Sequence, residues 1–161
     1  MSTKARNKKD VRGSLEGAVI FWMHRVDRKC RSEVLSRFRS RGYPLSAIQW
    51  EVLTMLWQQD GAIQTVLAEA TGTDKASMTR ILDRMVRDEL VERRMDPDDR
   101  RAFRIHLTTK GKVLHTKLLP IVEEVIKMTF DSFNSQQLTA LQNGLKQMFY
   151  NLDHADAADQ A

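Results

Sequence analysis

The stretch "KASMTRILDRMVR", from Lys75 to Arg87, has side chains of the kind that read DNA. At about 100° per residue, its apolar residues share one helical face and its polar residues the opposite face. Small residues near a helix start permit close approach to a duplex, and an arginine can donate two hydrogen bonds to guanine in the major groove. The pattern predicts a recognition helix whose DNA contacts come from Lys75, Ala76, Ser77, Thr79, Arg80 and Arg84. The alternative is a solvated helix face with internal charge pairs such as Asp83 with Arg87.

A second chemical signal follows directly in "DPDDRRAFRIHLTTKG", residues 96–111, where acids and arginines crowd into one turn. Pro97 and the neighbouring aspartates should stiffen the turn, with Asp99 assigned to stabilise it. Arg100 and Arg101 would then project from its tip, as suits insertion into a narrow, electronegative minor groove. We therefore predict a second DNA contact through these two arginines.

The charge balance sets a condition on this interpretation. The chain carries a net charge of +5, but residues 61–107 contain nine basic and nine acidic residues. Massed positive charge therefore cannot explain DNA binding by this segment. The acids must be turned inward or paired, so that the basic side chains that face DNA stand alone.

These side chains need a framework, and the sequence pattern predicts one that is mainly α-helical with a small β-hairpin. A long helix should begin at Ser14 and end at "RGYP", and Ser46 with Gln49 has capping-box spacing for the next helix. A short helix at 65–70, a Thr71-Gly72-Thr73 break and a helix at 74–88 form a helix-turn-helix pattern. Strands follow at 90–95 and 102–107, where Phe103, Ile105 and Leu107 alternate with polar residues. Thr108 and then Asn134 with Gln137 should cap two more helices, the first kinked at Pro120.

The segments "LSAIQWEVL", "LAEATGTDKASMTRILDRM" and "LVERRMDPDDRRAFRIHLTTKG" resemble the winged-helix core of the MarR family of bacterial transcription regulators. Asp99, Arg101, Leu107 and Thr108 match that family's D-x-R-x5-L-T wing signature. The resemblance implies a sequence-specific DNA-binding regulator, most often a repressor, that binds a near-palindromic operator on double-stranded DNA. Glu89 stands where the family usually has glycine, a departure that disfavours the left-handed helix end that glycine provides.

The resemblance also divides the chain. Residues 1–13 should be a disordered basic terminus, 14–45 an N-terminal dimerisation helix, 46–108 the DNA-binding lobe, 109–153 C-terminal dimerisation helices and 154–161 a flexible tail. A homodimer also follows from the residues, because the terminal helices carry more apolar surface than so small a lobe can cover. Members of the family commonly respond to small aromatic acids. The residues best placed to line such a pocket are Phe21, Trp22, His24, Arg25 and Trp50, although core packing is the better explanation for each of the three aromatic rings taken alone.

Other function classes have less support. A winged-helix protein-interaction module without DNA binding would suit the neutral local charge. Cys30, flanked by Arg28, Lys29 and Arg31, would suit a redox-sensing regulator, since nearby cations favour a thiolate. The four histidines lack metalloprotease spacing and no phosphate-binding glycine loop is present, so neither an enzyme, a metal site nor a cofactor is expected. With one cysteine, no signal peptide and no apolar run of bilayer length, a cytoplasmic protein without membrane contact is predicted.

Overall fold

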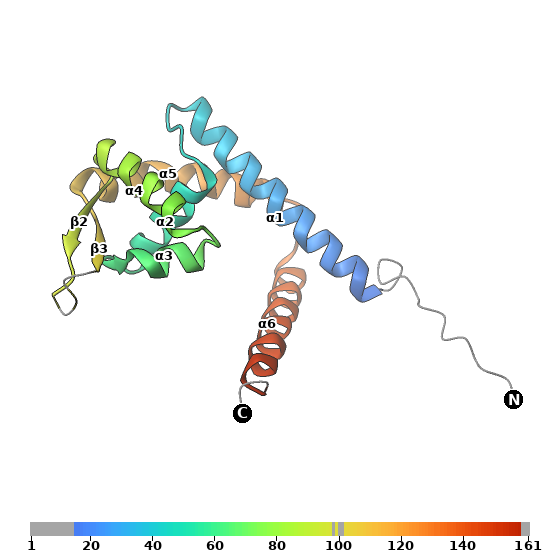
Figure 1. Cartoon of the computed structure of the whole chain (residues 1–161). Coiled ribbons are helices and arrows are strands. Elements are labelled where there is room, and N and C mark those ends of the chain that lie inside the picture. The colour runs from blue at the N-terminus through green and yellow to red at the C-terminus, as the bar shows by residue number, and fades with distance from the viewer. Residues whose placement is uncertain (1–14, 98, 100–101, 159–161) are drawn as a thin grey trace, which may run out of the picture. The chain divides into compact units, whose positions relative to one another are not determined.

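The computed structural model describes residues 15–97, 99 and 102–158. The chain divides into one unit of residues 1–125 and a second of residues 126–161. The elements are α1 (Leu15–Ser40), α2 (Ala47–Gln58), β1 (Ala62–Ile63), α3 (Gln64–Ala70), α4 (Lys75–Arg87), β2 (Val91–Met95), β3 (Phe103–Leu107), α5 (Thr109–Thr129) and α6 (Ser135–Ala158). Figure 1 shows them labelled in order. All the predicted helices are present. The predicted disordered terminus, residues 1–13, lies outside the described residues. Helix α6 extends to Ala158, into the segment predicted to be a flexible tail.

The core of the first unit lies between α2, α3, α4 and the sheet (Figure 1). Leu53, Leu67, Leu82 and Ile105 are completely buried, one from each of these elements. From residues 17–40 of α1, Val34 and Phe38 are the buried side chains. The earlier part of α1 instead exposes a group of large apolar side chains: Val19, Ile20, Phe21, Trp22 and Val26. In the second unit, α6 exposes the stripe expected from the sequence, including Leu138, Leu141, Leu145, Phe149 and Leu152.

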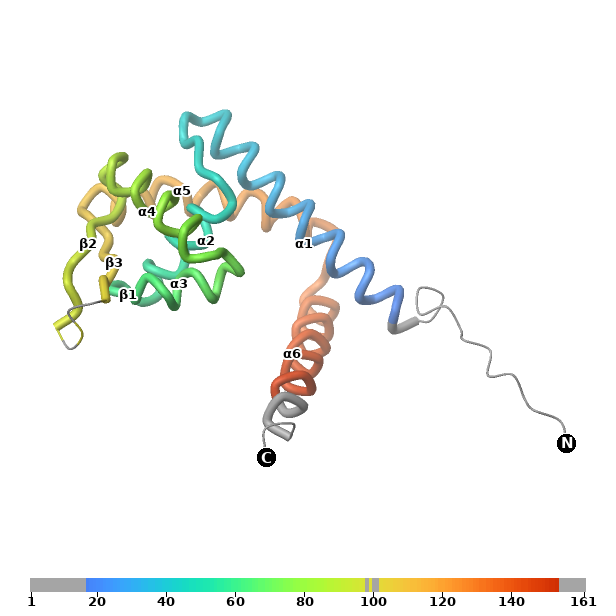
Figure 2. The backbone as a smooth tube through the Cα atoms, viewed as in Figure 1, coloured from blue at the N-terminus to red at the C-terminus, as the bar shows by residue number. Residues whose placement is uncertain are grey.

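The predicted hairpin forms, and a short third strand joins it. Strands β2 and β3 pair antiparallel, with Val91 opposite Leu107 and Met95 opposite Phe103. Strand β1 pairs on the other side of β3, which gives the order β1-β3-β2 seen in Figure 2. Phe103 is 44% exposed, so the predicted apolar alternation of β3 is wrong at that position. It lies at the wing end of the strand, where no second layer of the core covers it.

Side-chain caps fix three helix starts, as the sequence predicts. The Ser46 and Gln49 capping box is complete, and the Gly111 N–H donates to Thr108 Oγ1 at 3.0 Å. Asn134 and Gln137 exchange the same kind of paired bonds before α6. Helix α5 is continuous through Pro120. In the part of the chain that the structure describes, no helix has the length and apolar character to cross a membrane.

The junction between α4 and β2 corrects one expectation from the sequence. Glu89 has a φ of 58°, so the left-handed helix end is kept even without glycine. The turn is held by the Leu90 N–H, which donates to the Met85 carbonyl at 2.9 Å, and by the Thr108 hydroxyl, which donates to the Glu89 carbonyl at 2.5 Å. These bonds impose on Glu89 a conformation that glycine adopts with less strain.

Replacing Glu89 with glycine is therefore expected to raise the free energy of unfolding by about 1 kcal/mol. The substitution also removes the ion pair with Lys110, 3.2 Å between exposed side chains, which contributes little. Urea denaturation at one fixed protein concentration measures the change. Asp88→Gly is the matched control, because Asp88 has a φ of −79° and should be destabilised by glycine. Equal effects of both substitutions would contradict the argument.

Candidate nucleic-acid interface

The turn between α3 and α4 sets the angle of the predicted recognition helix. Gly72 has a φ of 61°, and the Thr73 N–H donates to the Ala68 carbonyl at 2.9 Å. The Thr71 hydroxyl donates to the Leu67 carbonyl at 2.8 Å and closes the end of α3. The chain therefore reverses within three residues, which is the helix-turn-helix geometry expected from the sequence.

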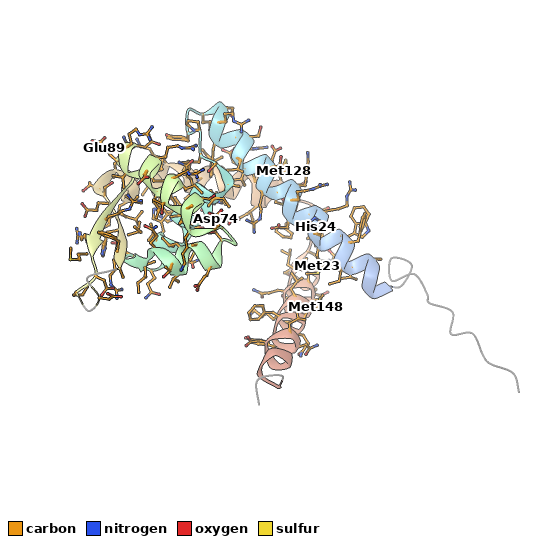
Figure 3. The ribbon with its side chains drawn as sticks, viewed as in Figure 1. Met23, His24, Asp74, Glu89, Met128 and Met148 are labelled. Atoms are coloured by element: carbon orange, nitrogen blue, oxygen red, sulfur yellow. The ribbon has the colours of Figure 1, made fainter. Side chains whose placement is uncertain are left out.

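Helix α4 begins at a carboxylate rather than at an open anion site. Asp74 is the N-cap, and its Oδ1 accepts the Ser77 N–H at 2.9 Å. Hydrogen bonds from the Ser77 hydroxyl and from its backbone N–H hold the pKa of Asp74 below its usual range. The Asp74 carboxylate therefore already occupies the helix N-terminus, which is a common binding place for a phosphate group. Figure 3 marks Asp74 and Glu89, the residues that flank α4 at its two ends.

The two faces of α4 differ as the sequence predicts. Met78, Leu82 and Met85 are completely buried, whereas Val86 is 38% exposed and does not belong to the buried stripe. The opposite, exposed face carries Lys75, Ala76, Arg80, Arg84 and Arg87. Arg80 and Arg84 form no hydrogen bond or salt bridge with any residue the structure describes. Their guanidinium groups are therefore available to an external partner.

Thr79 has a structural role that the sequence analysis did not identify. Its hydroxyl accepts a hydrogen bond from Gln64 Nε2 at 2.9 Å and donates to the Lys75 carbonyl at 2.9 Å. The Gln64 side chain thus links the start of α3 to α4. A glutamine at the first position of a helix gives no sequence signal for such a contact, because its partner depends on how the two helices cross.

Arg93 on β2 is a second residue that sequence reasoning missed. Its Nη1 lies 2.5 Å from Asp83 Oδ1, and its Nη2 donates to the Thr79 carbonyl at 3.2 Å. Asp83 therefore pairs across to the sheet, and this ion pair replaces the Asp83 with Arg87 pair considered as an alternative. Arg93 joins the recognition helix to the strand that leads into the wing.

The base of the wing is closed by a buried carboxylate. Asp96 is 4% exposed, its Oδ2 lies 2.7 Å from Arg104 Nε, and its Oδ1 accepts the Asp99 N–H at 3.2 Å. The Ala102 N–H donates to the Asp99 carbonyl at 2.9 Å. Asp96 therefore stabilises the base of the wing. The same role for the Asp99 side chain remains a prediction. The predicted contacts Arg100 and Arg101 lie outside the described residues.

Three ion pairs on the hairpin strands bring part of the module's opposite charges together. Arg93, Arg94 and Arg104, on the two hairpin strands, pair with Asp83, Glu92 and Asp96 respectively. Glu89 contacts Lys110 of α5. Asp83, Glu92 and Asp96 are thus paired within the module, whereas Glu69 and Asp88 are exposed and form no salt bridge with a described residue, so the expected segregation of charge is met only in part. The exposed cations of α4 remain on its outer face.

Two of the histidines contact different partners. His106 Nδ1 lies 3.4 Å from Asp60 Oδ2, whereas His115 stacks on Trp57 with ring centroids 4.6 Å apart. Burial acts to raise the pKa of Asp60, but the Leu107 N–H and the His106 ring hydrogen-bond to it and the net pKa is lowered. Within the described ranges, no group of three metal-ligating side chains forms.

The five residues assigned to an effector pocket fall into two places. The Arg25 guanidinium lies over the rings of Phe21 and Trp22, 5.5 and 5.8 Å from their centroids, and all three side chains are exposed. His24 is also exposed on this part of α1 (Figure 3). Trp50 packs against Phe38 with ring centroids 4.8 Å apart. Trp50 therefore lies near Phe38, which is roughly 20 Å further along α1 than Arg25. A single chain does not bring the five predicted pocket residues together. Cys30 is partly buried on the same helix.

Comparisons with known proteins agree with this geometry. The MarR family model matches residues 45–103. The homoprotocatechuate degradative operon repressor of Escherichia coli is 31% identical over 118 residues, which cover 70% of this chain and 80% of that protein. The HTH-type transcriptional repressor NicR of Pseudomonas putida is 29% identical over 111 residues, 69% of this chain and 70% of its own.

Solved structures extend the match. A MarR transcriptional regulator from Methanosarcina mazei Go1 has a TM-score of 0.67 and 29% identity, covering 84% of this chain and 94% of its own. A MarR family transcriptional regulator from Silicibacter pomeroyi has a TM-score of 0.70 and 25% identity, with 86% and 92% covered. The similarity therefore extends well beyond the segment matched by the family model.

Proposed function

Because the chain belongs to the MarR family of transcriptional regulators, we propose that it reads operator DNA with the exposed face of α4. One observation supports this most directly: Arg80 and Arg84 lie outward and form no hydrogen bond or salt bridge with a described residue, while Asp83 between them is paired with Arg93. Lys75 and Ala76 lie on the exposed side of the first turn, where close approach to base edges is needed. Thr79 and Ser77 would contribute mainly by positioning α4, since their polar groups are already engaged.

The wing should supply the second contact. Asp96 and Arg104 brace its base, and Asp99 continues the turn. Arg100 and Arg101 follow within two residues, so we assign them to the adjacent minor groove.

Regulators of this family bind DNA and function as dimers. The exposed apolar residues of α1 and α6 support a dimer of this chain, since surfaces of this size are usually covered by a partner. On this basis residues 14–45 and 109–153 form the dimerisation region and 46–108 the DNA-binding lobe.

The dimer is expected to select a near-palindromic operator with half-site centres one helical turn, roughly 10 bp, apart. In vitro selection with the purified full-length chain, followed by footprinting, measures this spacing. Analytical ultracentrifugation at micromolar concentration checks the dimer independently. A single asymmetric half-site would argue against paired lobes. Failure to enrich any sequence would favour the alternative of a protein-interaction module.

Because the Escherichia coli and Pseudomonas putida relatives are both named repressors, we propose repression as the mode of control.

We further propose that a small aromatic acid modulates this binding. The Arg25 guanidinium, flanked by Phe21 and Trp22, offers a cation beside two exposed rings, and His24 adds a second polar group. A ligand held there between two copies would favour a spacing of the lobes that does not fit successive grooves. Trp50 would belong to the same site only if the partner's α1 reaches it.

Such an acid should lower operator affinity, and operator DNA should weaken binding of the acid by the same factor. Fluorescence anisotropy of labelled operator, with hydroxybenzoates and phenylacetates at millimolar concentration, measures the effect. Arg25→Ala should abolish it while leaving affinity without ligand unchanged. Equal operator affinity across the whole panel would remove support for the site. The alternative of redox sensing through Cys30 is tested in the same assay. If Cys30 is the sensor, peroxide should change the operator affinity of the unmodified chain and should not change that of Cys30→Ser.

A further inference from the structure

The charges of α1 are unevenly distributed around the helix. At about 100° per residue, one sector of residues 28–39 contains only basic and hydroxyl side chains. This sector, the α1 basic stripe, consists of Arg28, Lys29, Ser32, Ser36 and Arg39, and all five are exposed. It lies away from Val34 and Phe38, which are buried. From its first residue to its last, the stripe is about 17 Å long.

Two acids of α1 are paired with cations that do not belong to the stripe. Asp27 lies 2.9 Å from Arg31, and Glu33 lies 2.8 Å from Arg37. Among the described residues, none forms a hydrogen bond or a salt bridge with the three cations of the stripe. The stripe therefore presents unbalanced positive charge to the solvent.

The stripe and the exposed face of α4 lie on different sides of α2. Helix α1 packs on α2 through Phe38, whose ring centroid lies 4.8 Å from that of Trp50. By helical projection, Trp50 is on the opposite side of α2 from Val52 and Leu56, which are buried in the core together with residues of α4. A duplex held by α4 therefore does not cover the stripe.

A polyanion fits the stripe better than a second copy of the chain does. Two copies of the stripe would repel each other in a symmetric contact, and the apolar residues of α1 proposed for the dimer end at Val26, before the stripe begins. The sequence ahead of α1 has the same basic character, with Lys4, Arg6, Lys8, Lys9 and Arg12 against Asp10 alone. Positive charge is thus continued along the chain, and a partner rich in negative charge is favoured.

Double-stranded DNA matches the stripe more closely than an acidic protein helix. Every side chain of the stripe can donate a hydrogen bond, and phosphate oxygens are acceptors. A duplex carries one charge per about 1.7 Å, so about ten phosphates lie along a length of about 17 Å. An acidic helix of that length has only about three turns that can face the stripe.

We propose that the α1 basic stripe binds the phosphate backbone of a second DNA duplex. Arg28, Lys29 and Arg39 neutralise phosphates, and the hydroxyls of Ser32 and Ser36 donate to phosphate oxygens between them. Such contacts carry no sequence information, so the second duplex can have any sequence. The protein would then join an operator, held by α4, to a separate segment of DNA. This bridging rests on the proposed function, whereas the binding of DNA by the stripe does not.

The test measures binding of a second duplex to protein that already holds an operator. Full-length protein is mixed with one equivalent of selected operator per dimer, and a labelled duplex of unrelated sequence is titrated at low salt. Fluorescence anisotropy measures its affinity, and sedimentation velocity with two dyes identifies a complex that contains both duplexes. We expect this complex, and its absence overturns the proposal. If no operator can be selected, the titration is done without one, and the stripe variant then tests the binding by itself.

The stripe variant combines Arg28→Gln, Lys29→Gln and Arg39→Gln. It should weaken binding of the second duplex at least about tenfold at low salt, and the slope of log K against log salt should fall by about 0.9 for each lost phosphate contact. Affinity for the operator should be unchanged. The substituted side chains are exposed, so the variant should fold, which circular dichroism checks.

A charge-matched control combines Lys117→Gln, Lys127→Gln and Lys146→Gln, which are exposed positions on α5 and α6. It should bind the second duplex as the unmodified chain does. Equal losses in the two triple variants would reduce the effect to net charge and overturn the proposal, as would unchanged binding in the stripe variant. Displacement of the duplex by poly-glutamate as readily as by unlabelled DNA of equal charge would instead assign the stripe to acidic proteins.

Discussion

Replacing Gly111 with alanine is expected to lower the free energy of unfolding by about 3 kcal/mol or more. A Cβ at this position would lie 2.1 Å from the Leu90 carbonyl oxygen and 3.1 Å from its carbon, which are backbone atoms that cannot rotate away. Helix α5 cannot retreat easily, because the Gly111 carbonyl accepts the Trp57 Nε1–H at 3.1 Å and its N–H donates to Thr108. Thermal and urea unfolding at fixed protein concentration measure the loss.

Gly144→Ala is the matched control for this experiment. Gly144 lies within α6, and apart from its chain neighbours and its own helix backbone, no atom of the described residues lies within 4 Å of the position of an added Cβ. Alanine there should raise helix stability by up to about 1 kcal/mol, since glycine is the poorer helix former. Opposite signs at the two positions are therefore expected. A Gly111→Ala protein as stable as its parent would show that the approach of α5 to Leu90 is not a constraint.

Arg80→Ala is expected to weaken binding to the selected operator by about 1 to 3 kcal/mol and to relax preference at one base position. The side chain lies on the exposed face of α4 and has no described intramolecular salt bridge, so its loss should leave thermal stability unchanged. Competition binding against operators with single-base changes measures both effects. Arg87→Ala is the control, since this cation lies in the last turn of α4, away from the end that approaches bases.

Loss of the wing arginines should change DNA affinity in a different way from loss of Arg80. Arg100→Ala with Arg101→Ala should weaken binding to many sequences, most where the flanks are rich in A·T pairs. For every phosphate that the variant no longer neutralises, the slope of log K against log salt should also fall by about 0.9. If neither Arg80→Ala nor the double wing variant alters affinity for any selected DNA, the groove-reading assignment is wrong. The protein-interaction alternative would then be the better account.

Local signals in the sequence predicted much of the fold. The caps at Ser46 and Thr108 form as expected, and Gly72 marks the turn where its positive φ is needed. Such features depend on neighbours within a few residues, so spacing alone reveals them. The exposed face of α4 was predictable for the same reason, because helical periodicity separates Arg80 from Met78.

Contacts between distant segments could not be read in this way. The partner of Arg93 is ten residues away and the partner of Gln64 is fifteen, and both pairs depend on how elements cross. At Glu89 the sequence misled in the opposite way. The lack of a glycine there argued against a left-handed helix end, yet Glu89 adopts that conformation. Long-range packing at Leu90 and Thr108 imposes that conformation more strongly than the residue type opposes it.

The contacts of Thr79 and Asp83 also bear on how this protein can diversify. Gln64 holds α4 through the Thr79 hydroxyl, and Arg93 holds it through Asp83 and the Thr79 carbonyl, so neither contact uses Ala76, Arg80 or Arg84. Under the proposed function, orientation and base preference are therefore encoded by different side chains. Substitutions at positions 76, 80 and 84 would then change the preferred operator while the helix keeps its angle, so a regulatory network could be rewired without refolding the lobe.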